Sequence, residues 1–359
     1  MICNALIGLV MFVNYHNDPA ALVPPGATTA EVRALPGLPG SGTVDAFAFI
    51  NGLALVIVDG NAYWQNPSTC AWIFYENIYD PSFYQYTFYM VNDQWYHRYN
   101  TGVSLPISTE FSEDFESGAT VGDLLPPNAS RFTWIVLLSP LAPNVPAYNA
   151  LGACLRAGTC DFLDNRLDFV STVVHSGQKS LRFYAVPPSP ESLTSKSLLD
   201  RGLVIFRKGD DAWYSGWYYA EGDLPFTLLD FETSGINGRP GFRITLRNGA
   251  LGAELKWLDK PTYLQDPGSM VTFPSGQWVN VRVHVLFSED EFGKVEIWQD
   301  GVRVLSQQGR TLPTADSVID YLQVGITATP RETVLYVDDI HLSATPKFSA
   351  IIRKSLPHR

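Results

Sequence analysis

Apolar and polar residues alternate strictly in residues 321–328 (YLQVGITA). Leu322, Val324 and Ile326 fall on one side of an extended chain, and Tyr321 and Gln323 fall on the other. This period of two residues is typical of a β-strand with one face in a core. Comparable stretches occur at residues 203–207, 213–221, 241–247, 278–287, 294–305 and 333–343. With no convincing amphipathic helix, the pattern predicts an all-β sandwich.

The first third of the chain has a hairpin pattern of its own. Two apolar runs meet at Asn51 and Gly52, and a second hairpin is predicted over residues 83–102 with its turn near Asn92. We therefore predict a small β-rich domain over residues 1–108, expected to serve assembly or attachment.

The sandwich is then expected over residues 109–345, where a resemblance described below implies a jelly roll, and a C-terminal tail follows at 346–359. The Pro-rich segment 126–165 reads as an irregular insertion within it.

The apolar run at residues 5–13 is too short to span a bilayer. It also lacks a basic segment before it and a prompt cleavage site after it, so a buried first strand is favoured over a signal peptide. No other stretch is a membrane candidate.

Charge limits the partners. The chain has 25 Lys and Arg against 36 Asp and Glu, a net charge of -11. Nucleic-acid binding needs clustered positive charge, so no nucleic-acid partner is expected. Aromatic residues make up 13% of the chain and favour β-structure.

The four cysteines include no C-x-x-C pair, so no zinc site is expected. Cys154 and Cys160 flank a short loop. They are read either as a disulfide or as two buried thiols, because the redox compartment is not known from the sequence.

Alternate residues of a strand point to opposite faces, and in four of the predicted strands the residues opposite the apolar face form an unusual set. They are planar groups that can hydrogen-bond or stack, and this is the chemistry of sugar recognition. The alternative is a solvated face, or one covered by the N-terminal domain. The expected ligand-binding residues are Arg243, Arg247, Arg282, His284, Trp298, Tyr321 and Gln323.

Residues 278–305 (WVNVRVHVLFSEDEFGKVEIWQDGVRVL) resemble the core hairpin of concanavalin A-like jelly rolls, in particular the heparin-lyase and alginate-lyase branch of the polysaccharide lyases. Further matching segments are 114–118, 175–183, 213–225, 321–326 and 334–343. The resemblance covers about residues 110–345. It indicates the fold more than the activity, because this fold hosts lectins, glucanases, lyases and structural modules alike.

The resemblance implies a test of activity. A lyase needs a group that abstracts the proton alpha to a uronic carboxylate, and a cation or amide that neutralises that carboxylate. In those branches the strand matching 321–328 typically reads K-x-G-x-Y, but here Gln323 and Thr327 stand at the Lys and Tyr positions. If the chain is a lyase, His284 with Tyr321 is the expected catalytic pair.

The resemblance also implies a structural Ca²⁺ between the first and last strands. Its expected ligands are Asp114, Glu116, Gly118 and Asp338, which offer the oxygen atoms that calcium prefers. Ordinary edge acids are the alternative. No other cofactor is expected.

Together these features favour a non-catalytic, lectin-like protein that binds a poly- or oligosaccharide, with an enzyme the less favoured reading. Without a clear signal peptide, display on a virion or cell surface is expected, with contacts to other subunits through the N-terminal domain. One alternative is a polysaccharide lyase acting by β-elimination on a uronic-acid-containing glycan. The other is a structural or decoration protein of a viral particle.

Overall fold

The computed structural model describes residues 29–34, 37–42, 44–50, 53–59, 61–65, 72–77, 86–91, 94–99, 104–106, 110–125, 131–190, 193–206, 208–233, 241–256, 261–314, 317 and 319–344. The apolar run at 5–13 and the tail at 346–359 lie outside these residues, so the predictions made for them stay predictions.

The described part of the N-terminal region is rich in strands. After the short helix α1 (Thr29–Arg33), a four-stranded sheet has the order β1-β2-β3-β4, and a three-stranded sheet has the order β5-β6-β7. The strands are β1 (Val44–Ile50), β2 (Leu53–Val58), β3 (Asn61–Gln65), β4 (Trp72–Asn77), β5 (Tyr86–Val91), β6 (Gln94–Tyr99) and β7 (Ser104–Pro106). Both predicted hairpins are confirmed, because Ile50 pairs with Leu53 and Val91 pairs with Gln94. The domain boundary at residue 108 stays a prediction.

An eight-stranded antiparallel sheet forms one layer of the sandwich. Its order is β10-β11-β22-β13-β18-β19-β20, and β8 pairs with β22. The strands are β8 (Phe111–Glu113), β10 (Arg166–Val170), β11 (Ser180–Ala185), β13 (Asp211–Glu221), β18 (Trp278–Leu286), β19 (Lys294–Gln299), β20 (Val302–Gln308) and β22 (Thr333–Ser343).

A seven-stranded antiparallel sheet forms the other layer, in the order β17-β16-β15-β14-β21-β12-β9. Its strands are β9 (Trp134–Val136), β12 (Ser195–Phe206), β14 (Thr227–Thr233), β15 (Phe242–Arg247), β16 (Ala250–Leu255), β17 (Thr262–Tyr263) and β21 (Ile319–Thr329).

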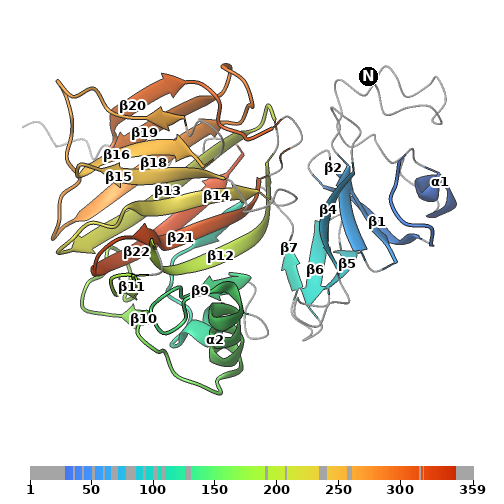
Figure 1. Cartoon of the computed structure of the whole chain (residues 1–359), viewed down its shortest axis with the longest axis horizontal. Coiled ribbons are helices and arrows are strands. Elements are labelled where there is room, and N and C mark those ends of the chain that lie inside the picture. Colours follow the sequence, from blue (N-terminus) through green and yellow to red (C-terminus); the bar gives the residue numbers. More distant parts are fainter. Residues whose placement is uncertain are drawn as a thin grey trace, which may run out of the picture.

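One apolar core lies between the two sheets (Figure 1). Val281 and Val283 of β18 enter it from the eight-stranded sheet, and Phe231 of β14 and Val324 of β21 enter it from the seven-stranded sheet. All four are fully buried or nearly so, and each alternates with a residue that points to the outer face. The predicted all-β sandwich is confirmed.

The segment expected to be an irregular insertion contains a helix, so that part of the prediction is wrong. The helix α2 (Val145–Ala157) begins where the Asn144 side chain accepts a hydrogen bond from the Ala147 N–H at 3.0 Å. It ends at Gly158, whose φ of 65° lies in the left-handed region that glycine adopts freely. An Asn cap, an early proline and a closing glycine were readable in the sequence. A short 3-10 helix, η2 (Val121–Leu124), precedes it.

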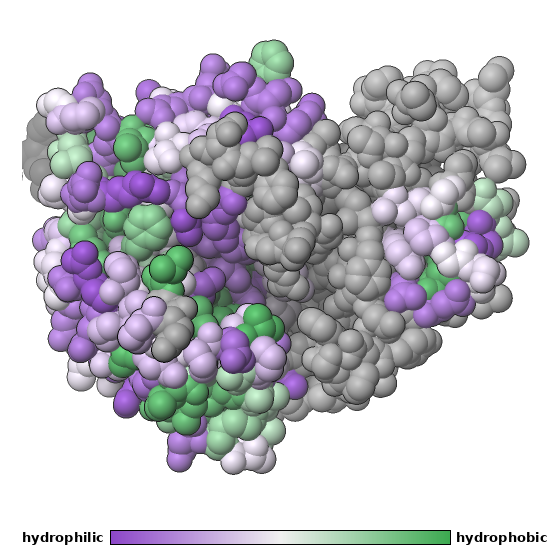
Figure 2. All heavy atoms as spheres, in the orientation of Figure 1, coloured by the Kyte–Doolittle hydropathy of each residue, from purple (hydrophilic) through white to green (hydrophobic). Residues whose placement is uncertain are grey.

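The surface around α2 is apolar in part. Leu141 and Val145 are more than half exposed, and Leu163 is also exposed. Figure 2 shows the corresponding hydrophobic patch in the region where Figure 1 places α2.

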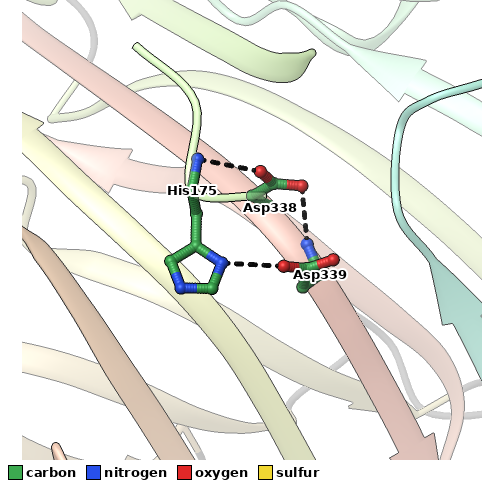
Figure 3. Close-up of side chains that lie close together, drawn as sticks. All are labelled: His175, Asp338 and Asp339. Carbon is green, nitrogen blue, oxygen red and sulfur yellow. Dashed lines mark hydrogen bonds and ion pairs between the residues drawn. The ribbon is translucent and has the colours of Figure 1, made fainter. Parts of the chain in front are cut away.

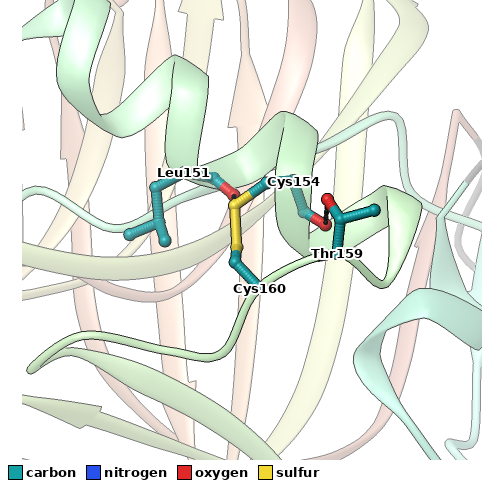
Figure 4. Close-up of a disulfide and its surroundings, with 4 residues drawn as sticks. All are labelled: Leu151, Cys154, Thr159 and Cys160. Atoms are coloured by element: carbon teal, nitrogen blue, oxygen red, sulfur yellow. Dashed lines mark hydrogen bonds between the residues drawn. A yellow bond between two sulfur atoms is a disulfide. The ribbon is translucent and has the colours of Figure 1, made fainter.

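Cys154 and Cys160 form a disulfide, with their Cα atoms 5.5 Å apart (Figure 4). The bond ties the last turn of α2 to the segment that follows it, and both residues pack against the core. Of the two readings that the sequence left open, the structure has the disulfide.

Removing this disulfide should destabilise the jelly roll. For so short a loop, the chain-entropy relation gives a loss of about 2 kcal/mol. The Cys154→Ser, Cys160→Ser double variant should therefore melt roughly 4 to 8 °C below the unmodified protein in scanning calorimetry. An unchanged melting temperature would show that α2 is held by packing alone.

Candidate functional site

A row of polar side chains crosses the outer face of the seven-stranded sheet. Backbone pairing aligns Glu254 of β16 with Arg243 of β15, Arg243 with Asp230 of β14, Asp230 with Gln323 of β21, and Gln323 with Asp200 of β12. We call these five residues the polar row. Because their chain neighbours enter the core, all five point to the outer face.

Lys256, which directly follows β16, reaches over β15 to the acids of β14. Its Nζ lies 2.9 Å from an Asp230 carboxylate oxygen, and it also contacts Glu232. The glycine at 241 leaves room for this contact, since a Cβ there would lie 1.9 Å from the Phe231 carbonyl oxygen and 2.6 Å from Glu232 Oε2. Lys256 therefore forms ion pairs with two carboxylates that are almost fully buried.

Burial changes the proton affinities of this cluster. Burial raises the pKa of Glu232 to about 7, against the opposing charge of Lys256. For Asp230, burial acts in the same direction, but Lys256 and Lys196 outweigh it and lower its pKa. Burial also lowers the pKa of Lys196, with a further contribution from the charge of Lys256. Lys196 therefore gives up its proton more readily than an ordinary lysine.

The two arginines of β15 share one carboxylate. Arg243 Nε lies 2.6 Å from Glu254 Oε1, and Arg247 contacts the other oxygen, Oε2. Both guanidinium groups lie over the Phe226 ring, at 5.1 and 5.2 Å from its centroid. Two cations against one acid leave this end of the face positive, and 37% of the Arg247 side chain is exposed.

Gln323 lies in the polar row between Asp230 and Asp200. It is 8% exposed, and its Oε1 has no hydrogen-bond partner in the described part of the chain. Tyr321, two residues before Gln323 in β21, points to the same outer face. It pairs with Glu232 and Gly202 and is partly exposed. Thr327 is buried, and its hydroxyl lies 2.7 Å from Asp230 Oδ1, so it supports the row from within.

The expected ligand-binding residues lie on two different sheets, so they do not form one site. Arg243, Arg247, Tyr321 and Gln323 belong to the seven-stranded sheet, whereas Arg282, His284 and Trp298 belong to the eight-stranded sheet. Parity says which side of a strand a residue occupies, but it does not say which sheet the strand joins.

The predicted catalytic pair is separated for the same reason. His284 points outward from β18 and Tyr321 points outward from β21, with the core between them. His284 is also held by other groups. Its Nδ1 lies 3.0 Å from Glu296, its Nε2 contacts Asp211, and its ring stacks on Trp213 at 3.9 Å. His284 therefore holds an ion cluster together and does not approach Tyr321.

The expected calcium ligands do not form one cluster in the described residues. The Gly118 carbonyl accepts a hydrogen bond from Lys179 Nζ at 2.6 Å, and the Glu116 carbonyl accepts another from the same atom at 3.2 Å. The Glu116 carboxylate accepts the backbone N–H groups of Gln178 and Lys179. Asp114 accepts the N–H of Glu116 at 3.1 Å. A lysine ammonium thus lies at the carbonyls expected to bind calcium.

Asp338 belongs to a different group, with His175 and Asp339 (Figure 3). Asp338 accepts the backbone N–H of His175 at 3.1 Å, and the His175 ring lies 2.8 Å from Asp339. Burial raises the pKa of Asp338 to about 6. The described oxygens fit the Ca²⁺ prediction poorly, and that prediction still rests on the sequence.

A model of the family described as polysaccharide lyase matches residues 155–341, slightly more than half of the chain. The chain belongs to the polysaccharide lyase family. If this protein is an enzyme, family membership indicates a polysaccharide lyase, which is the enzyme class that the sequence predicted.

The solved structures that the chain is similar to include lyases. An endo-β-1,4-glucuronan lyase from the fungus Trichoderma reesei is 18% identical, with a TM-score of 0.41, covering 51% of this chain and 88% of that one. The cellulose induced protein Cip1 is 18% identical, with a TM-score of 0.44, covering 66% and 97%. Alginate lyase A1-II', of polysaccharide lyase family 7, is 12% identical, with a TM-score of 0.38, covering 60% and 95%. Likeness at this level says nothing about the substrate.

No curated protein matches the chain. Neither α-helix in the described residues has the length and apolar character of a membrane span.

Most of the charged groups in and around the polar row were missed from the sequence. They are Lys196, Asp200, Asp230, Glu232, Glu254 and Lys256. A signal was present, because Asp230 and Glu232 alternate with apolar residues in 227–233 (TLLDFET). A carboxylate at alternate positions of a buried strand needs a cation from a neighbouring strand.

Lys179 should stabilise the fold, because its ammonium group donates hydrogen bonds to the carbonyl oxygens of Glu116 and Gly118. Lys179→Met leaves two carbonyl oxygens without their charged donor, which should cost roughly 1 to 3 kcal/mol. Thermal melting with and without EDTA measures this. We expect the variant to melt lower and EDTA to leave the unmodified protein unchanged. A melting temperature that EDTA lowers by several degrees would instead support bound calcium.

The ionised Glu296 carboxylate should stabilise the folded state at all but acidic pH. Burial disfavours its charge, but hydrogen bonds from Lys294 and His284 bring its pKa down to about 2. A carboxylate whose pKa is lowered by folding stabilises the folded state at a pH above its unfolded-state pKa, here near 4.5. This stabilisation is lost as the pH falls toward 2. The contribution is on the order of 3 kcal/mol.

Urea unfolding of the Glu296→Gln variant and the unmodified protein tests this. The stability difference between them should be largest above pH 5 and shrink as the pH falls toward 2. A difference that does not depend on pH would contradict the assignment.

Proposed function

We propose that this protein is a polysaccharide lyase that cleaves a uronic-acid-containing glycan by β-elimination. The proposed site is the outer face of the seven-stranded sheet. One observation carries the assignment: the Gln323 amide lies in register between Asp230 and Asp200, two acids that interact electrostatically with Lys196, a lysine whose pKa burial has lowered. Family membership supports the reaction type.

β-Elimination needs three things from a protein. A cation or amide must neutralise the uronic carboxylate, so that the neighbouring C–H becomes acidic. A base must take that proton, and an acid must protonate the departing glycosidic oxygen. The bond between that oxygen and the sugar carbon breaks as a carbon–carbon double bond forms.

The described residues can supply these roles. The Gln323 amide is placed to donate to the carboxylate, with the partly exposed Lys256 adding positive charge. Lys196 is the base in this proposal, because a lysine with a lowered pKa is neutral in more molecules at a given pH. Tyr321, partly exposed on the same strand as Gln323, is the acid.

Arg243 and Arg247 extend the site along β15. Their shared Glu254 leaves one net positive charge, and Arg247 is the more exposed of the two. A planar guanidinium suits a carboxylate. These arginines would hold the uronate of a neighbouring sugar in the same chain.

A non-catalytic, lectin-like function is the second candidate. The observation in its favour is that β21 carries Gln323 and Thr327 where a Lys and a Tyr were expected, and that Thr327 is buried. Both functions share the same face and ligand class, and they differ only in product. A decoration protein of a viral particle would need neither, and it would give stable oligomers without a glycan ligand.

The disulfide supports action outside the cytoplasm, because such bonds persist in oxidising compartments. Display on a virion or cell surface, with subunit contacts through the N-terminal region, is retained as part of the proposal.

Ultraviolet absorbance of unsaturated uronides, measured over a panel of polyuronides and glycosaminoglycans, tests the reaction. Lys196→Met should lower kcat/KM about 10²- to 10⁴-fold, as expected for loss of a general base. Gln323→Ala should lower it about 10²-fold through loss of one preorganised donor. In the unmodified enzyme, kcat/KM should rise with pH as Lys196 loses its proton.

Lys208→Met is the matched control, because Lys208 pairs with Glu289 outside the polar row. It should keep full activity. No product from any polymer, together with retained binding, would leave the lectin-like function in place of the lyase. Full activity in Lys196→Met would remove Lys196 from the mechanism.

A further inference from the structure

The outer face of the eight-stranded sheet carries a second group of aromatic and cationic side chains. Backbone pairing aligns Ser215 of β13 with Arg282 of β18, and Arg282 with Trp298 of β19. Trp213, two residues before Ser215, lies near Trp298, with ring centroids 6.0 Å apart. Both tryptophans are partly exposed, although their strands contribute alternate residues to the core.

Arg282 is the exposed cation of this group. Its Nε donates to Asn280 Oδ1 at 3.1 Å. No carboxylate of the described residues forms an ion pair with its guanidinium, and it is exposed. The nearby acids are already engaged, since Glu296 contacts His284, Lys294 and Arg303. The guanidinium is therefore available to an anion from solution.

The aromatic rings beside Arg282 are held in place. Trp213 stacks on the His284 ring with an interplanar angle of 7°, and His284 is fixed between Asp211 and Glu296. A ring that is already immobile loses little entropy when a ligand packs on it. The ion cluster around His284 thus prepares the surface next to Arg282.

We propose that Trp213, Arg282 and Trp298 form a second, non-catalytic binding site for an acidic polysaccharide. A sugar ring would pack its C–H face against Trp298 while its carboxylate pairs with Arg282. The chain has a net charge of -11, so an exposed arginine beside two partly exposed tryptophans is a local exception that favours an anionic ligand. A neutral glycan would leave that charge without a partner.

This site is distinct from the polar row, because the apolar core separates the outer faces of the two sheets. It takes its ligand class from Arg282 and does not depend on the lyase reaction. A long polyuronate could be held on one face while another segment of it, or another chain, occupies the opposite face. Such a site would raise the local concentration of polymer at the enzyme.

Affinity electrophoresis of the full chain through native gels containing alginate or polyglucuronate tests the site. The Lys196→Met variant serves as the background, so that the polymer is not consumed. In that background, Arg282→Gln and Trp298→Ala should each remove at least half of the retardation. Arg331→Gln, at an exposed arginine that only approaches Asp223 at 3.9 Å, is the matched control and should change nothing.

Thermal melting checks that each variant is folded. If Trp298→Ala does not fold, Arg282→Gln still tests the site, because Arg282 is exposed and its replacement should not disturb the fold. Gln323→Ala should remove the other share of retardation, and the losses should add, because independent distant sites are additive. Unchanged retardation in Arg282→Gln would overturn the second site, whatever the absorbance assay shows. Equal retardation in a gel of neutral hydroxyethyl cellulose would overturn its acidic ligand class.

Discussion

Charge compensation across the outer face of the seven-stranded sheet is the constraint on which the proposed site depends. Asp230, Glu232 and Glu254 are almost fully buried, and removing the partner of a buried charge costs several kcal/mol. Lys256 meets the first two acids, and Arg243 meets the third. These pairings fix the lysine and arginine head groups in place. A glycan carboxylate would meet a preorganised set of donors instead of mobile surface side chains.

The two faces of the sandwich are built differently on the same backbone pattern. In the seven-stranded sheet, burial lowers the pKa of Lys196 and raises that of Glu232, and the charge of Lys256 opposes the second shift. The eight-stranded sheet ties its acids to His284 and stacks aromatic rings beside them. The first arrangement suits proton transfer, and the second suits holding a ligand without reacting with it.

The sandwich was predictable because each strand carries its own alternation, as in 321–328, and each hairpin carries its own turn residues. The grouping of site residues was not. Arg282 and Arg243 have the same local pattern, yet their strands join different sheets, and that choice depends on pairing between distant segments. Lys196 and Lys256 were missed because burial and charged groups from distant parts of the sequence set their surroundings. The helix α2 was missed although its cap residues were visible, because prolines before it suggested an irregular segment.

A crystal structure of the Lys196→Met variant with a bound tetrauronate tests most directly whether the glycan reacts on the outer face of the seven-stranded sheet. We expect one uronic carboxylate within hydrogen-bond distance of the Gln323 amide, and Tyr321 beside the glycosidic oxygen. A ligand bound only at Arg282 and Trp298, with the polar row free of sugar in crystals and in solution, would contradict it.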